Sequence, residues 1–225
     1  PCEFIATNVH GTSNVISACR TMGVKRAVFI GSDKQVDAVN VYGATKMLAE
    51  RLWTQANGYS PYGTAYVSCR YGNVALSRGS VIPLWQSQRA AGQSLTITDT
   101  RMTRFWLSLE DAVRLVWFAA CHSPRGAVLV PHLPAFSVMD LLDAVCGQDQ
   151  HRSLRVIGIR PGEKMHESLM GCDEVYRAWW HDPYYAIPPT VASWETDTRW
   201  QAWTRAGLVP PYRSDVWADR LSCEA

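Results

Sequence analysis

The chain has 225 residues, of which 47% are hydrophobic, and its formal net charge at pH 7 is +2. This length is enough for one domain with a modest second lobe, and the hydrophobic content excludes a disordered tail. The nearly neutral charge, without runs of Lys and Arg, argues against a nucleic-acid partner. The longest apolar run, residues 115–121, is too short to span a bilayer, so we expect no membrane partner either.

Seven cysteines are present, without a C-x-x-C pair or zinc-like spacing. Cys19, Cys69, Cys121 and Cys146 lie within apolar runs, where a free thiol packs as a small hydrophobe. This usage favours a reduced, cytoplasmic setting. His166 and Glu167 have no second ligand pair at a suitable spacing, so we expect no metal site.

The first predicted elements are a helix over residues 1–23 and a strand over 24–30. Gly23 is a stop signal for the helix. The strand is short and dense in Val, Ile and Phe, which is typical of a buried parallel strand. It ends in the sequence Gly-Ser-Asp-Lys at residues 31–34.

A second helix is predicted to open at Tyr42-Gly43-Ala44-Thr45-Lys46. Tyr42 and Lys46 are four residues apart and share a helix face. An ammonium one turn from a phenol favours the phenolate, and Ser32 could hold a substrate hydroxyl against it; together they suit proton removal from a sugar alcohol during hydride transfer. A Tyr-x-x-x-Lys pair also occurs by chance in many helices. The adjoining Ser-Asp-Lys at the carboxyl end of a strand favours the functional interpretation.

Further along the chain the elements alternate. Strands are predicted over 64–70 and 95–99, with an amphipathic helix within 79–92 between them, and capping boxes at Ser108 and Ser137 predict helices over 109–121 and 138–146. Residues 126–130 and 154–159 are predicted to be strands of a smaller lobe. From Trp179 onward the chain is rich in aromatic residues, including Trp194 and Trp217. Without a basic patch, these favour packing over base stacking.

Three arginines follow the predicted strands over 95–99 and 154–159: Arg101, Arg104 and Arg160. The planar guanidinium suits a pyrophosphate, and Arg104 is the preferred candidate of the first two. A surface ion pair is an equally good interpretation of Arg101. The Pro161-Gly162 turn can aim Arg160 inward.

Four blocks of sequence carry a family resemblance. They are GSDKQVDAVNVYGATKMLAE (31–50), RYGNVALSRGSVIPLW (70–85), ITDTRMTRFWLSLEDAV (97–113) and IGIRPGEKMHE (157–167). In this order they resemble the extended short-chain dehydrogenases/reductases, and within them the UDP-N-acetylglucosamine 4,6-dehydratases. The third and fourth blocks are most similar to the inverting group of pseudaminic acid biosynthesis. The resemblance covers about residues 1–190.

The resemblance implies an α/β fold, with a partial Rossmann-like, doubly wound parallel sheet and a small α+β substrate lobe. Residues 1–75 would form the carboxyl-terminal half of an NAD(P)-binding domain with the catalytic segment. Residues 76–225 would form mainly the substrate lobe, with returns to the sheet and an aromatic tail. The family's G-x-x-G-x-x-G turn is absent from the sequence. We therefore expect a chain missing its first part, which on its own binds NADP weakly and is inactive.

The implied reaction converts UDP-N-acetylglucosamine into a UDP-4-keto-6-deoxy sugar, with inversion at carbon 5, in surface-glycan or nonulosonate biosynthesis. NADP (or NAD) would be tightly bound and regenerated, and the complete protein would be a homo-oligomer. Tyr42, aided by Lys46 and Ser32, would take the carbon-4 hydroxyl proton. Lys34 would take the carbon-5 proton and Asp33 would protonate the leaving carbon-6 hydroxyl.

Other residues receive binding roles from the same resemblance. The cofactor would be held by Tyr42, Lys46 and Val74, and the UDP-sugar by Asn73, Arg104 and Arg160. Leu76 stands where relatives usually have Gly, and its larger side chain would crowd the cofactor. Two alternatives stay open: another NAD(P)-dependent nucleotide-sugar epimerase or reductase, and an inactive truncated module that pairs with an intact dehydratase.

Overall fold

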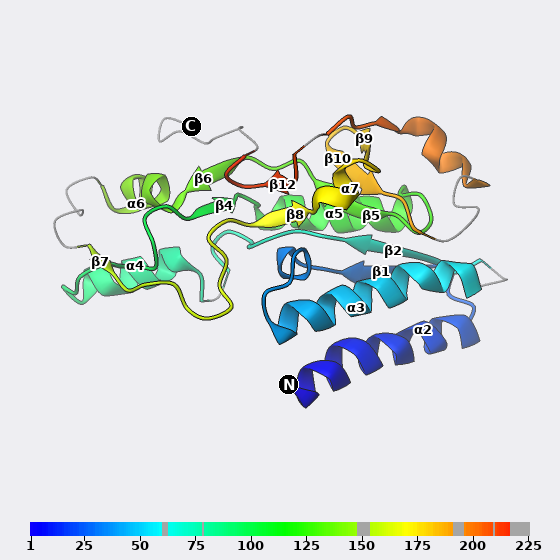
Figure 1. The fold of residues 1–225 in the computed structure, drawn as a ribbon, viewed down its shortest axis with the longest axis horizontal. Helices are drawn as coiled ribbons and strands as arrows, with labels where there is room; N and C mark the ends of the chain where they lie inside the picture. The colour runs from blue at the N-terminus through cyan, green and yellow to red at the C-terminus, as the bar shows by residue number, and fades with distance from the viewer. Residues whose placement is uncertain (60–62, 78, 148–153, 191–195, 209, 217–225) are drawn as a thin grey trace. The chain divides into compact units, whose positions relative to one another are not determined.

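The structure is a computed structural model that describes residues 1–59, 63–77, 79–147, 154–190, 196–208 and 210–216 (Figure 1). The chain forms two compact units. Unit 1 contains residues Pro1–Tyr71, Glu110–His132 and Ser168–Tyr212, and unit 2 contains Gly72–Leu109, Leu133–Glu167 and Arg213–Ala225.

Unit 1 is built on a six-stranded sheet. In spatial order its strands are β1 (Arg26–Ile30), β2 (Ala65–Cys69), β5 (Val128–Pro131), β10 (Tyr184–Ile187), β9 (Trp179–His181) and β11 (Thr204–Arg205). The first three are parallel, with Val28 opposite Val67 and Ser68 opposite Val128. The others pair antiparallel. Every residue of β2 and β5 is buried, as an inner strand requires.

The strand over residues 126–130 was predicted to lie in the smaller lobe, and this prediction is wrong. The strand, β5, lies in the main sheet between β2 and β10. Its continuous apolar run fits a strand that is covered on both faces. The predicted strand over 154–159 is shorter than expected, and its part β7 (Arg155–Val156) lies in unit 2.

The amino-terminal helix predicted over residues 1–23 is present, with a wider turn inside it. It consists of α1 (Cys2–Phe4), the π-helix η1 (Ile5–His10) and α2 (Gly11–Thr21). The next helix, α3 (Val41–Gln55), contacts β2 and lies beside α2 (Figure 1). Further helical segments among the described residues of this unit are η2 (Asp33–Gln35), η3 (Ala56–Tyr59), α5 (Leu109–Cys121), α7 (Cys172–Val175) and η6 (Thr198–Ala202).

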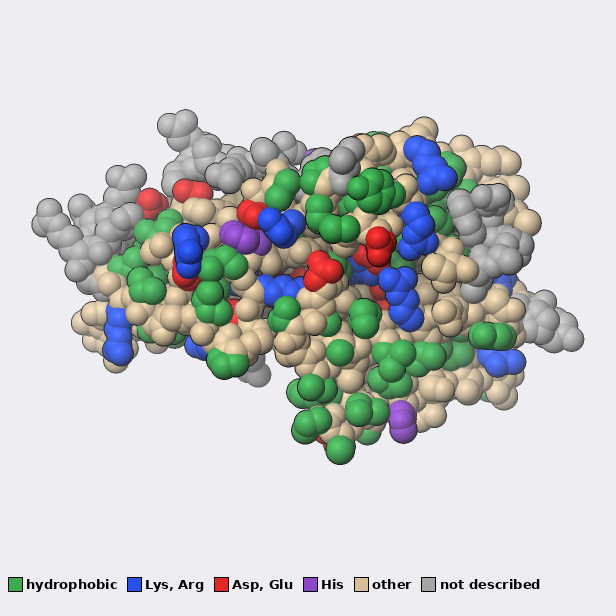
Figure 2. All heavy atoms as spheres, viewed as in Figure 1, with side chains coloured by type: hydrophobic (Ala, Val, Ile, Leu, Met, Phe, Trp, Pro, Cys, Tyr) green, Lys and Arg blue, Asp and Glu red, His purple; other side chains and the backbone are tan. Residues whose placement is uncertain are grey.

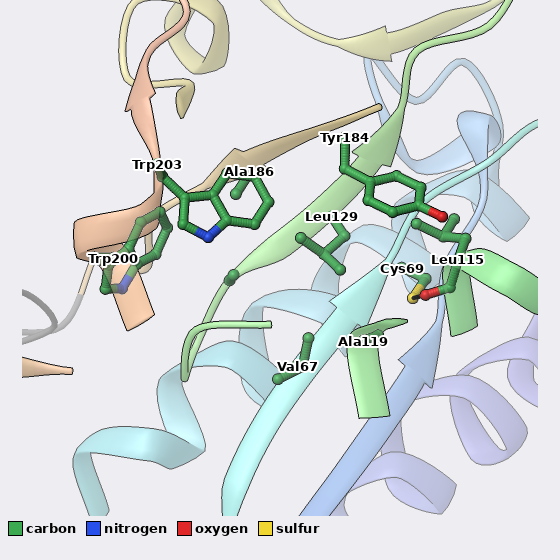
Figure 3. Close-up of a cluster of buried hydrophobic side chains, with 10 residues drawn as sticks. Val67, Cys69, Leu115, Ala119, Leu129, Tyr184, Ala186, Trp200 and Trp203 are labelled. Carbon is green, nitrogen blue, oxygen red and sulfur yellow. Dashed lines mark hydrogen bonds between the residues drawn. The ribbon is translucent and has the colours of Figure 1, made fainter. Parts of the chain in front are cut away.

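One core cluster of unit 1 lies between the sheet and α5, and Figure 3 shows ten of its side chains. Trp200 and Trp203 are buried in it, so for these two the prediction of packing is confirmed. Trp194 and Trp217 lie outside the described residues. Cys69 also belongs to this cluster, and burial raises the pKa of its thiol to about 12, as expected of a thiol that packs as a hydrophobe. Cys121, in contrast, is exposed.

A second cluster joins α2, α3 and β2 through Cys19, Trp53 and Tyr66. The Trp53 indole nitrogen also donates to the Val67 carbonyl oxygen at 2.9 Å. These contacts fix α3, the helix that carries Tyr42 and Lys46, on the sheet.

In the described part of unit 2 there are two short strand pairs and two α-helices. They are α4 (Val81–Ala90), β3 (Thr96–Ile97) parallel to β7, β4 (Thr103–Phe105) antiparallel to β6 (Ala135–Ser137), and α6 (Val138–Cys146). The capping box predicted at Ser137 is confirmed, because its hydroxyl accepts from the Asp140 backbone N–H. The hydrophobic core of this unit contains the buried side chains of Trp85, Leu95 and Leu142.

A separate two-stranded sheet is formed by β8 (Ser168–Met170) and β12 (Tyr212–Arg213). Over the part of the chain that the structure describes, no helix has the length and apolar character needed to cross a bilayer.

Candidate functional site

The turn after β1 holds a buried carboxylate between a hydroxyl and an ammonium. Asp33 is 4% exposed, and its Oδ1 accepts from Ser32 Oγ at 2.9 Å and from Lys34 Nζ at 3.1 Å. The Lys34 side chain is 44% exposed. The turn thus places an acid and an amine next to each other at the carboxyl end of a parallel strand, where ligands of α/β sheets bind.

The start of α3 is packed directly on this turn. The Asn40 side chain caps the helix by accepting from the Gly43 backbone N–H at 2.8 Å. A Cβ at Gly43 would lie 2.2 Å from the Lys34 carbonyl oxygen, so only glycine allows this approach. Tyr42 therefore begins α3 at the same junction that holds Ser32, Asp33 and Lys34.

Lys46 extends from α3 toward the end of β1. Its Nζ donates to the Ile30 carbonyl oxygen at 3.3 Å and lies 5.1 Å from the centroid of the Phe29 ring, within range of a cation–π contact. Burial lowers the pKa of Lys46, and the Glu50 carboxylate partly opposes this effect. Tyr42 is half-buried, and its ring packs edge-on against Phe4, with centroids 5.7 Å apart.

Beside Lys46 is a pocket of about 400 Å³ between α2, β1 and α3. It is lined by Thr7, Asn8, Gly11, Thr12, Val15, Val28, Phe29, Ile30, Lys46 and Trp53. Asn8 lies in the π-helix η1, and its Nδ2 donates to Thr45 Oγ1 at 3.0 Å. The sequence analysis missed Asn8 and Thr12 as site residues. The sequence offered one signal for Asn8, because Asn is a poor helix former and yet stands inside a predicted helix. The structure adds that Asn8 lies in a π-helical turn, a feature that is frequent at functional sites.

In unit 2, the carboxylate of Glu167 gathers several of the predicted substrate-binding groups. Its Oε1 accepts from Asn73 Nδ2 at 2.6 Å, and its Oε2 accepts from the Phe105 backbone N–H at 3.0 Å. Arg104 Nε lies 3.5 Å from Oε1. Glu167 is 3% exposed. The sequence analysis considered it only as half of a rejected metal site, and its long-range partners were not visible in the sequence.

The three predicted arginines have different surroundings. Arg104 Nη1 donates to the carbonyl oxygens of Thr103 at 2.7 Å and Met165 at 3.0 Å, so this guanidinium ties β4 to residues 163–167. Arg101 pairs with Asp99 through two hydrogen bonds, and its side chain is 75% exposed. The surface ion pair, which was the alternative for Arg101, is what the structure shows.

Arg160 is exposed and begins a tight turn. The Glu163 backbone N–H donates to the Arg160 carbonyl oxygen at 3.0 Å, and Gly162 has φ 81°, the value that position demands of glycine. The predicted turn is confirmed, whereas the inward direction of Arg160 is not: its side chain faces solvent.

Val74 and Leu76 lie in the loop after Tyr71. Val74 is half-buried, and Leu76 is exposed with φ 59°. This left-handed conformation favours glycine, which is the residue expected there from the resemblance. Within the described ranges, no group of three or more His, Cys, Asp and Glu side chains is placed to hold a metal ion.

Comparisons with known proteins show the family of the chain, and they include relatives with two different named activities. A family model described as polysaccharide biosynthesis protein matches residues 1–189. A UDP-N-acetylglucosamine 4,6-dehydratase (inverting) of Campylobacter jejuni is 41% identical over 193 residues, which are 85% of this chain and 57% of the relative. A UDP-glucose 4-epimerase of Rickettsia massiliae is 42% identical over 190 residues, which are 84% of this chain and 56% of that protein. The chain thus spans little more than half the length of these relatives.

Solved structures share the architecture. The X-ray structure of Pen from Bacillus thuringiensis has a TM-score of 0.86 and 36% identity, and the match covers 100% of this chain and 66% of Pen. A dTDP-glucose 4,6-dehydratase from Bacillus anthracis, solved in complex with NAD, has a TM-score of 0.64 and 14% identity, and the match covers 72% of this chain and 58% of that one. The second likeness confirms the Rossmann-like α/β fold.

Proposed function

Since this chain belongs to the polysaccharide biosynthesis protein family, we propose that the protein is a nucleotide-sugar dehydratase. It converts UDP-N-acetylglucosamine into a UDP-4-keto-6-deoxy sugar, with inversion at carbon 5, in the synthesis of surface glycans such as those that contain pseudaminic acid. The C. jejuni relative, whose name states this activity, supports the proposal.

The observation that carries the proposal is the buried Asp33 held between Ser32 and Lys34. Removing water across carbons 5 and 6 requires a base for the carbon-5 proton and an acid for the departing carbon-6 hydroxyl. Transfer of a proton from the Lys34 ammonium to the Asp33 carboxylate along their hydrogen bond gives a neutral amine and a carboxylic acid. The amine is the base that takes the carbon-5 proton, and the carboxylic acid is the acid that protonates the leaving hydroxyl, so both groups return to their charged forms. The proton and the hydroxyl leave as water, which balances the step. An epimerase acting at carbon 4 needs neither group.

Tyr42 removes the proton of the carbon-4 hydroxyl, and Lys46 and Ser32 assist it. The ketone formed at carbon 4 makes the carbon-5 proton more acidic, which is what allows Lys34 to take it. Packing of Gly43 on the Lys34 carbonyl supports these roles of Tyr42 and Lys34, because it holds the end of α3 that carries Tyr42 against the turn that carries Lys34.

The pocket beside Lys46 fits one end of a nicotinamide cofactor. Its Thr7, Asn8 and Thr12 side chains and the Lys46 ammonium can bind ribose hydroxyls, and Val74 would contact the nicotinamide. A nicotinamide held there would supply hydride chemistry, serving as the acceptor for carbon 4 and the donor for carbon 6. Solved structures of similar fold in complex with NAD support this class of cofactor.

For the UDP part of the substrate we propose Asn73, Arg104 and Arg160. Arg160 has an exposed guanidinium in a tight turn. Arg104 already donates to two carbonyl oxygens, so it would serve a diphosphate by exchanging one of these bonds or by its charge alone. A solved relative in complex with UDP-glucose and NAD supports a UDP-sugar ligand.

We also propose a cytoplasmic location and a homo-oligomer. The six free cysteines among the described residues support the first. For the second, Figure 2 shows hydrophobic side chains gathered over the region of α2 and α3, where Val15, Met47 and Leu48 are each more than two-fifths exposed.

The competing function is a nucleotide-sugar 4-epimerase, which the Rickettsia relative supports. The test is product identification by NMR. A chimera that joins the amino-terminal part of the C. jejuni relative to this chain is incubated with UDP-N-acetylglucosamine and NADP. A dehydratase replaces the carbon-6 hydroxymethyl signals with a methyl doublet, whereas an epimerase retains them and inverts carbon 4. The epimer as sole product would overturn the proposal.

A further inference from the structure

The side-chain amide of Gln35 joins the catalytic turn to α3. Its Oε1 accepts from the Ser32 backbone N–H at 3.1 Å, and its Nε2 donates to Oε1 of Glu50. Gln35 is 2% exposed and Glu50 is 1% exposed. Because an amide is an acceptor at one end and a donor at the other, this single side chain bridges the turn and a residue of α3 that lies 15 positions further along the chain.

The bridge has a matching backbone requirement at Gly31. A Cβ there would lie 2.9 Å from Gln35 Nε2 and 2.9 Å from the Cys69 carbonyl oxygen. Any other residue would push the Gln35 amide away from Glu50. The glycine before Ser32 therefore makes room for the bridge.

Glu50 is held from its other side as well. Its Oε1 accepts from Ser68 Oγ at 2.9 Å, and its Oε2 accepts from Arg70 Nη2. Arg70 is 3% exposed, and its Nη1 donates to Glu174 Oε2 at 2.6 Å. A buried ion pair with this many hydrogen bonds has little freedom to move. Glu50 is thus a fixed point to which Gln35 attaches the turn.

We propose that Gln35 and Glu50 are positioning residues, which set the Ser32–Lys34 turn against the helix that carries Tyr42 and Lys46. Glu50 lies one helical turn after Lys46, so the same segment of α3 carries the anchor and the ammonium. The inference rests on the proposed function of the turn. Nothing in the bridge touches a substrate; it acts through Ser32 and its neighbours.

A purely structural role makes a different prediction. If Gln35 only filled space, an apolar residue of its size could replace it. Loss of the bridge would then speed amide exchange throughout unit 1 or leave it unchanged everywhere. If Gln35 positions the turn, its loss frees the Ser32–Lys34 amides while β2 stays protected. The Glu50 charge stays paired with Arg70 in either case.

The test is hydrogen exchange by NMR on the 225-residue chain, without substrate or cofactor, so that failure of the dehydratase assay does not affect it. Gln35→Met removes both hydrogen bonds. Gln35→Glu keeps the acceptor but sets a carboxylate against Glu50. The double variant Gln35→Glu with Glu50→Gln restores the hydrogen bond in the opposite direction, because the amide at position 50 now donates to the carboxylate at position 35. The matched control is Arg51→Gln, which also lies in α3 and bonds Glu174 from the exposed side.

We expect the Ser32 amide to exchange about tenfold faster in Gln35→Met, because its own buried hydrogen bond is lost. It should also exchange faster in Gln35→Glu, because repulsion between the two carboxylates displaces the retained acceptor from Glu50. The double variant recovers slow exchange, Arg51→Gln leaves it unchanged, and the Val67 amide in β2 stays protected throughout. A ¹³C-dimethyl label on Lys34 should shift in the two single variants and return in the double variant.

Two results would overturn the inference. One is wild-type exchange at Ser32 in both single variants. The other is faster exchange at Ser32 and Val67 together without recovery in the double variant, which would assign Gln35 to general stability. If Gln35→Met does not fold, Gln35→Glu and the double variant decide by the same readouts.

Discussion

At the scale of single residues, Lys46 has surroundings that oppose its charge. Burial lowers its pKa, and Glu50 is the group that raises it. The chain has four lysines, so ¹³C-dimethyl labels can follow each one in an NMR titration. We expect the pKa of Lys46 to lie below the ordinary lysine value of 10.5. Glu50→Gln removes the opposing charge and should lower the pKa of Lys46 further.

The same shift predicts the alkaline limb of activity. Turnover that needs the Lys46 ammonium falls as pH rises through its pKa, and in Glu50→Gln this fall should move to lower pH. A pKa of Lys46 at or above the ordinary value of 10.5, or no response of this pKa to Glu50→Gln, would contradict the assignment of its environment.

Tyr42 is the residue whose chemistry is most easily separated from its packing. Tyr42→Phe keeps the ring contact with Phe4 and removes only the phenolic oxygen. In the chimera we expect turnover to fall by about 10²–10⁴-fold, the usual loss of a general base, with UDP-sugar affinity nearly unchanged. Tyr176→Phe, at a tyrosine that is 66% exposed, is the control. Turnover near the wild-type rate in Tyr42→Phe would remove this residue from the mechanism.

At the scale of elements, the junction between α3 and the turn depends on a missing side chain. Alanine usually stabilises a helix by about 0.5–1 kcal/mol relative to glycine. At Gly43 its Cβ would collide with the Lys34 carbonyl oxygen, whereas at Gly11 in α2 the nearest atom is 3.8 Å away. We expect Gly43→Ala to lower the free energy of unfolding by about 1–3 kcal/mol and Gly11→Ala to raise it slightly, both measured by urea denaturation. Equal effects at the two glycines would refute the close approach.

A second element-scale prediction concerns α7, which is tied to β2 through Glu174. Burial alone would raise the pKa of Glu174, but the charge and hydrogen bonds of Arg70 and the Gly171 N–H outweigh it and lower the pKa to about 2. A depressed carboxyl pKa stabilises the fold above the ordinary value near 4.5. This contribution is lost as pH falls from there toward 2.

Urea denaturation of Glu174→Gln at several pH values tests this tie. Above pH 5 the variant should be less stable than the wild type by about 3 kcal/mol, and the difference should shrink as the pH falls toward 2. Arg70 keeps Glu50 as a partner in the variant. A difference that does not change with pH would show that the Glu174 charge is not involved.

Local elements could be predicted from the sequence where one short segment determines them. Helix α6 follows from the Ser137 capping box, and the turn at Gly162 follows from Pro-Gly. The assignment of β5 to the smaller lobe was wrong, because an apolar run shows that a strand is buried but not which sheet contains it. The Gln35–Glu50 bridge and the Glu167 carboxylate could not be predicted, because their partners are brought together by the tertiary fold.

At the scale of the whole molecule, the chain spans 57% of the C. jejuni relative. Its pocket beside Lys46 offers polar groups for one end of a dinucleotide, and the sequence has no glycine-rich turn for the pyrophosphate. The expectation that the 225-residue chain alone binds NADP weakly and does not turn over therefore stays a prediction. For this reason, turnover is measured on the chimera and not on the 225-residue chain.

The most direct test of the account is the fate of carbon 5 in D₂O. The chimera is incubated with UDP-N-acetylglucosamine and NADP, and the sugar product is examined by NMR and mass spectrometry. We expect a 4-keto-6-deoxy product that carries solvent deuterium at carbon 5, and loss of this incorporation in Lys34→Ala. A product that keeps its carbon-6 hydroxyl and gains no deuterium, or incorporation that is undiminished in Lys34→Ala, would contradict the account.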